Sequence, residues 1–108
     1  MRASGFSVLS FVLVALAHVA SAKAGETIVV KITDLAFVPA EVSARVGDTI
    51  EWVNADFIDH TATASNGAWD LALPAGSRGR LVVKQAGVLG YFCRVHPNMT
   101  GTLNVNEK

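Results

Sequence analysis

After residue 22, apolar and polar residues alternate along the chain with a period of two. The segments with this pattern are short and rich in β-branched residues, and turn-forming Gly, Asp, Pro and Asn residues separate them. A period of two places neighbouring side chains on opposite faces of a strand, so these segments are predicted to be β-strands. The predicted strands are residues 27–32, 41–46, 49–54, 60–65, 80–85, 88–93 and 100–106.

The alternation also predicts which side chains face the core. Ile28, Val30 and Ile32 would share one face of the first strand, and Ile50 and Trp52 would share one face of a later strand. No segment after residue 22 has a convincing helical period. Seven or eight short strands without helices predict an all-β fold, in the form of a two-sheet antiparallel β-sandwich.

The first 22 residues have a different character. Arg2 precedes an apolar run, and small residues end the segment as Ala-Ser-Ala at positions 20–22. The apolar run contains Ser and His and is short for a membrane span. We therefore expect a signal peptide cleaved after Ala22, a periplasmic location and a single domain over residues 23–108. The mature chain would not insert into a membrane; an uncleaved anchor is the alternative.

Charge and cysteine content narrow the function further. The chain has 9 basic and 9 acidic residues, and loss of Arg2 leaves 8 against 9, a net charge of −1. This balance argues against nucleic acid or an anionic membrane as partner. Cys93 is the only cysteine, so a disulfide within the chain is excluded. A free thiol is prone to oxidation after export, which indicates a bound ligand or a reactive role for Cys93.

The soft and imidazole donors after residue 22 are few and are clustered. They are His60, Cys93, His96 and Met99, and three of the four lie in the heptapeptide "CRVHPNM". Two His and one Cys with a weak axial Met are the ligands of a blue-copper electron-transfer site. The sequence therefore predicts one copper ion per chain. Pro97 restricts the backbone of the ligand loop.

Two further segments extend the resemblance from this motif to a family. "CRVHPNM", together with "GDTIEWVNADFIDHTAT" and "LAFVPAEV", resembles the cupredoxins, which are type I blue copper proteins. The Cys-x-x-His-x-x-Met spacing is similar to that of the amicyanins, whose ligand loop is short. The resemblance implies a Greek-key sandwich of seven to eight strands with copper near one end. It also implies that Asn54 braces the two loops that carry the ligands.

The same resemblance implies a function and partners. The protein would be a monomeric one-electron carrier and not an enzyme, cycling between Cu(II) and Cu(I). An amine dehydrogenase would be the donor and a c-type cytochrome the acceptor. Docking would take place near His96, on an apolar patch to which Val95, Pro97 and Phe57 contribute.

Other functions remain open from the residues alone. Cys93 and Met99 could simply pack in a core, and His60 could be a capping or surface residue, although chance is a poor explanation for the joint placement of the four donors. A catalytic thiol would use Cys93 with a histidine base, but this leaves Met99 without a role and no evident third residue to orient the base. Structural zinc sites usually lack Met. Copper storage or delivery is a further alternative, for which several Met or Cys residues would be expected.

Overall fold

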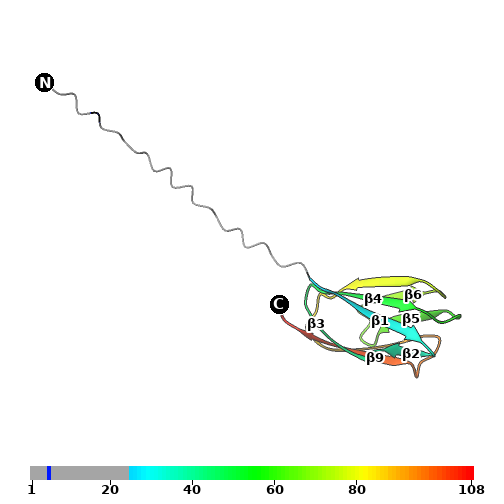
Figure 1. Cartoon of the computed structure of the whole chain (residues 1–108). Helices are drawn as coiled ribbons and strands as arrows, with labels where there is room; N and C mark the ends of the chain where they lie inside the picture. Colours follow the sequence, from blue (N-terminus) through cyan, green and yellow to red (C-terminus); the bar gives the residue numbers. More distant parts are fainter. Residues whose placement is uncertain (1–4, 6–24) are drawn as a thin grey trace.

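The computed structural model describes residue 5 and residues 25–108. The expected signal peptide, residues 1–22, lies outside the described residues apart from Gly5. The described part folds as an all-β sandwich (Figure 1). Its nine strands are β1 (Thr27–Thr33), β2 (Ala36–Val38), β3 (Glu41–Arg45), β4 (Thr49–Asn54), β5 (His60–Ala64), β6 (Asp70–Leu73), β7 (Arg78–Val82), β8 (Gly87–Phe92) and β9 (Thr100–Asn106).

All seven predicted strands are present, and two more were not predicted. β2 has three residues and β6 has four, so neither is long enough to show a clear alternation. The count is therefore nine, not seven or eight. The strand expected at residues 80–85 lies earlier, at Arg78–Val82, while the other bounds agree within one or two residues.

The strands form two sheets that enclose the core. The order is β2-β1-β4-β7 in the first sheet and β3-β9-β8-β5-β6 in the second. Among the described residues, five of the seven strand pairs are antiparallel, as expected, but β1 pairs with β4 and β3 pairs with β9 in parallel. Two residues join β2 to β3, so the chain changes sheets there without a hairpin. Because β3 lies in the second sheet, the chain returns to the first sheet at β4, which lies beside β1 and runs in the same direction.

The buried faces agree with the predicted alternation. Val30, Ile32, Ile50 and Trp52 are fully buried between the sheets, and Ile28 packs against them. In residue 5 and residues 25–108, no helix is long and apolar enough to cross a membrane.

Aromatic packing fixes the end of β8, next to Cys93. The Tyr91 ring packs edge-on against Phe37 and Trp52, with centroid distances of 4.6 and 5.4 Å. Tyr91 lies opposite Gly101 of β9, and a Cβ on Gly101 would be 2.3 Å from the Tyr91 ring. The missing side chain at this position therefore makes room for the ring, which holds the strand end that leads to Cys93.

Candidate metal centre

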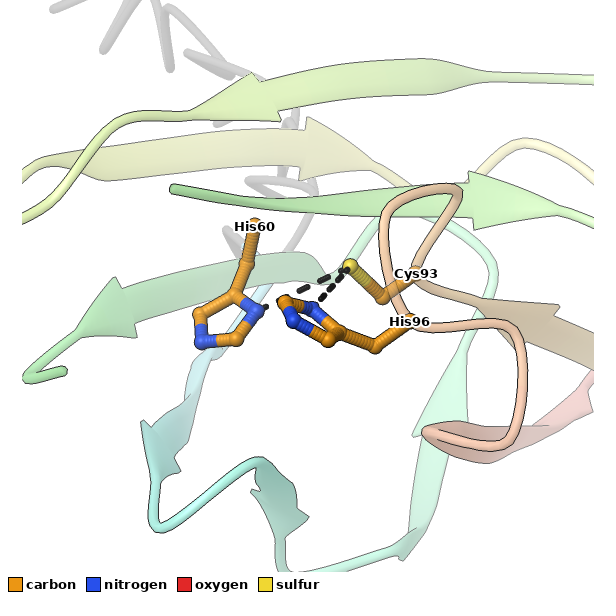
Figure 2. A group of neighbouring side chains, drawn as sticks. All are labelled: His60, Cys93 and His96. Carbon is orange, nitrogen blue, oxygen red and sulfur yellow. Dashed lines mark hydrogen bonds between the residues drawn. The ribbon is translucent and has the colours of Figure 1, made fainter. Parts of the chain in front are cut away.

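Neighbouring strands of the second sheet bring the predicted ligands together. His60 is the first residue of β5, and Cys93 directly follows the last residue of β8. β5 and β8 pair through Thr63 and Phe92, so these two strand ends are adjacent. His96 lies in the loop that follows, and Figure 2 shows both imidazoles turned toward the Cys93 sulfur.

The distances among the three donors fit a single metal ion. The Cys93 Sγ lies 3.7 Å from His60 Nδ1 and 3.8 Å from His96 Nδ1, and all three atoms lie within 4.8 Å of one another. Bonds of about 2.0–2.3 Å to one ion place three trigonal donors roughly 3.5–4.0 Å apart. A thiolate with two imidazoles is a donor set that suits copper, so the residues fit the expected ion.

Burial differs among the three donors. Cys93 is completely buried and His60 is 1% exposed, whereas His96 is half-buried. The two inner donors are therefore shielded from water. His96 alone of the three lies near the surface, in a loop with exposed neighbours.

The Cys93 thiol is poised to be a thiolate. Burial raises its pKa, but the Thr61 backbone N–H and the two imidazoles stabilise the anion and outweigh this effect. The net result lowers the pKa of the metal-free thiol from 9.0 to about 6. At neutral pH the sulfur is therefore in the form that binds metal ions.

Thr61 connects the two halves of the site, and the sequence did not reveal it. Its backbone N–H donates to Cys93 Sγ at 3.3 Å, and its Oγ1 accepts a hydrogen bond from the Arg94 backbone N–H at 2.9 Å. The only available signal was a hydroxyl residue directly after His60. Its significance depends on the pairing of β5 with β8.

Asn54 has a narrower role than expected. It is 1% exposed, and its Nδ2 donates to the backbone oxygens of Ile58 and Leu73 at 2.9 and 2.8 Å. Its Oδ1 accepts a hydrogen bond from the Asp56 N–H at 3.0 Å. These bonds hold the loop before His60, whereas the expected connection to the other ligand loop is made by Thr61.

Asp56 orients His60, and it too was not singled out from the sequence. Its Oδ2 lies 2.8 Å from His60 Nε2, and its carboxylate also accepts hydrogen bonds from the N–H groups of Asp34 and Leu35. Burial raises the pKa of Asp56, but the bonds from Leu35, His60 and Asp34 together hold it below its ordinary value. An ionised Asp56 accepts the proton of Nε2, which leaves Nδ1 free to bind a metal ion.

Two backbone hydrogen bonds close the second ligand loop. The Cys93 N–H donates to the Met99 oxygen at 3.0 Å, and the Met99 N–H donates to the His96 oxygen at 2.8 Å. Met99 is 5% exposed and belongs to the same buried cluster as Cys93. Pro97, in the same loop, is exposed.

The sequence of this chain is similar to that of a known copper protein family member. Amicyanin from Paracoccus versutus is 28% identical over 89 residues, which are 74% of this chain. The aligned part spans 65% of that relative, slightly under two thirds of its length.

The fold is also similar to solved structures of copper proteins. A Cu(I) structure of an amicyanin variant has a TM-score of 0.66 at 27% identity, covering 74% of this chain and 82% of that one. A copper-containing nitrite reductase from Thermus scotoductus SA-01 has a TM-score of 0.67 at 27% identity. The match covers 76% of this chain but 23% of the reductase. The family profile described as "Cupredoxin-like domain" matches residues 6–105, and the chain therefore belongs to the cupredoxin-like family.

Proposed function

We propose that this protein is a one-electron carrier with a single copper ion that cycles between Cu(II) and Cu(I). The observation that carries the proposal is that two imidazole nitrogens lie 3.7 and 3.8 Å from the Cys93 sulfur, with all three donors within 4.8 Å of one another. Bound copper would supply the redox couple. The matches to a Cu(I) amicyanin structure and to the cupredoxin-like family support the choice of metal.

The protein residues would hold the donors in nearly fixed positions. Cys93 provides the soft thiolate, and His60 and His96 provide the nitrogen donors. Thr61 and Asp56 hold Cys93 and His60 through hydrogen bonds of 3.3 and 2.8 Å. Such a site changes little between oxidation states, which favours rapid electron transfer. Met99 would provide the fourth, weak donor to the ion, because it is buried in the cluster that contains Cys93.

Two alternatives are less well supported by the site. Asp56 does provide the third residue that a Cys–His catalytic thiol needs, which the sequence did not suggest. However, Cys93 is completely buried, so a substrate has no direct access to its sulfur. The same burial disfavours copper storage or delivery, because transfer of the ion by ligand exchange requires access to the thiolate.

The exposed apolar residues of the two loops that carry the ligands support a docking role. Val95 and Pro97 flank His96 in the chain, and Val95 is 57% exposed; Phe57, in the loop before His60, is fully exposed. Weak redox complexes bury less than about 1,200 Å² in total, so a small apolar patch is sufficient. We propose that the monomer receives electrons from an amine dehydrogenase and passes them to a c-type cytochrome in the periplasm.

The copper assignment predicts the behaviour of Cys93→Ser. The parent loaded with Cu(II) should be intensely coloured, because a thiolate gives a strong ligand-to-metal transition. Serine is nearly isosteric, so the variant should fold but lose this absorption. Visible spectra, with circular dichroism as a check of folding, test the prediction. An equally coloured Cys93→Ser protein would exclude Cys93 as a ligand.

The proposed role of Met99 as a weak donor predicts the effect of Met99→Gln. The oxygen donor of glutamine is harder than a thioether and favours Cu(II), so the reduction potential should fall while copper stays bound. Met99→Leu is the matched control, because it keeps the volume and removes the donor; its potential should instead rise. Voltammetry measures both values. Potentials equal to that of the parent in both variants would assign Met99 to packing alone.

The docking proposal predicts that Val95→Glu slows electron exchange with a c-type cytochrome. A charge in the contact patch should reduce the second-order rate about tenfold, equivalent to about 1.4 kcal/mol, with little change in potential. Val88→Glu is the control, because Val88 is 77% exposed near the opposite end of β8 from Cys93. Stopped-flow kinetics give both rates. Equal rates for the two variants would place docking elsewhere.

The periplasmic location predicts a shortened chain. When the full sequence is expressed in a Gram-negative bacterium, the periplasmic extract should contain a protein that begins at Lys23. Intact mass and N-terminal sequencing identify the cleavage site. A protein that retains Met1 and stays in the cytoplasmic or membrane fraction would contradict both the cleavage and the location.

A further inference from the structure

A ring of hydrogen bonds connects the surface to the backbone beside Cys93. Thr63 Oγ1 lies 2.7 Å from Asp70 Oδ1, and Thr61 Oγ1 lies 2.9 Å from Thr63 Oγ1. The Arg94 N–H donates to Thr61 Oγ1 at 2.9 Å, and Arg94 Nε donates to Asp70 Oδ1 at 3.1 Å. The ring therefore joins β5, β6 and the loop that follows β8.

The chemistry of the ring gives each hydroxyl a single direction. An ionised Asp70 can only accept hydrogen bonds, so Thr63 must donate its hydroxyl proton to this carboxylate. The Thr63 oxygen then accepts from Thr61. The Thr61 oxygen remains free to accept from the Arg94 N–H. Hydrogen bonds aligned in one direction polarise one another, so the charge of Asp70 strengthens the bond to the Arg94 backbone.

Burial shows which links of the ring matter most. Thr61 and Thr63 are 5% and 8% exposed, whereas the Arg94 and Asp70 side chains are 50% and 52% exposed. Exposed ion pairs contribute little to stability and are screened by salt. A buried hydroxyl without its partner is costly by comparison. The hydroxyl chain, and not the surface ion pair, therefore gives the ring its rigidity.

Thr61 transmits this rigidity to Cys93. Its N–H bonds the Cys93 sulfur, while its Oγ1 bonds the next residue along the loop. We propose that Thr63 and Asp70 are positioning residues for the Cys93 thiolate, acting through the Thr61 hydroxyl without contacting a ligand. As far as it concerns copper, this inference rests on the proposed function. It assigns part of the geometry of that site to residues outside the ligand set.

The central test is Thr63→Val, which keeps the shape of the side chain and breaks the hydroxyl chain. In the metal-free protein, amide hydrogen exchange at Arg94 should accelerate about three- to tenfold, because its hydrogen bond is weakened. Thr63→Ser retains the hydroxyl and should restore the parent rate. Thr102→Val is the matched control, because Thr102 is a half-buried strand threonine outside the ring.

The copper-loaded protein gives a second readout. The thiolate-to-copper band and the copper–sulfur stretching frequency should shift in Thr63→Val, and should match the parent in Thr63→Ser and Thr102→Val. A general loss of stability would not produce this pattern of rescue. Unchanged exchange and spectra in Thr63→Val, or equal changes in Thr102→Val, would overturn the proposal.

Asp70→Asn provides an independent test that does not disturb the core. It keeps an accepting oxygen and removes the charge, so it should change Arg94 exchange in the same direction by a smaller factor. Asp59→Asn is its control, because the Asp59 carboxylate accepts a hydrogen bond from the Ala75 N–H and lies outside the ring. Identical exchange in Asp70→Asn and the parent would contradict the role of the carboxylate.

The two readouts separate this inference from the proposed function. If Arg94 exchange responds as expected but the parent gives no thiolate-to-copper band, the positioning of Cys93 stands and the copper function fails. If the parent has the band but neither Arg94 exchange nor the spectrum responds to Thr63→Val, the positioning role fails and the copper function stands.

Discussion

The hydrogen bond from the Thr61 N–H to the Cys93 sulfur is the contact on which the rest of the site depends. It joins the beginning of β5 to the end of β8, where the sheet brings His60 and Cys93 together. The bond also stabilises the thiolate, whose pKa is lowered to about 6. One backbone amide therefore contributes both to the position of the sulfur and to its charge.

His60 and Cys93, the two buried donors, are positioned in similar ways. Asp56 accepts a hydrogen bond from His60, and Asp70 begins the hydroxyl chain that ends beside Cys93. In each case an ionised carboxylate acts on a donor from a different element of the fold. Partners of this kind orient metal ligands and tune their basicity. The two residues whose N–H groups donate to Asp56, Asp34 and Leu35, have positive φ values of 50° and 60°. This backbone conformation is unfavourable for residues other than glycine.

The outer donor is held differently. His96 lies in a loop closed by backbone hydrogen bonds and is half-buried, so its surroundings are less constrained than those of His60. This contrast suits an electron carrier with the proposed copper site. The inner side of the site is rigid and dry, while the outer side is close enough to the surface for electron exchange with a docked partner.

The sequence by itself determined the all-β class, the seven longer strands and the group of candidate donors. The alternation of apolar and polar residues identifies the strands and the face of each strand that is buried. The chain has few His, Cys and Met residues, so few candidates for ligands remain. The same information could not identify Thr61, Asp56 or the ring through Thr63 and Asp70. Apart from the bond between Thr61 and Thr63 within β5, those contacts join residues 4 to 33 positions apart, and each depends on how the loops fold or which strands are neighbours.

Tertiary structure also decided the parallel pairs and the surroundings of Glu51. Successive residues of a strand face opposite sides, so Glu51 lies on the face of β4 opposite Trp52, and yet Glu51 is 4% exposed. Arg80 and, to a smaller extent, Arg78 of the neighbouring strand β7 pair with its carboxylate and hold its pKa below the ordinary value, although burial acts to raise it. A period of two specifies the face of a strand but not the strand beside it. Sheet order arises from packing across the whole core, which no local segment encodes.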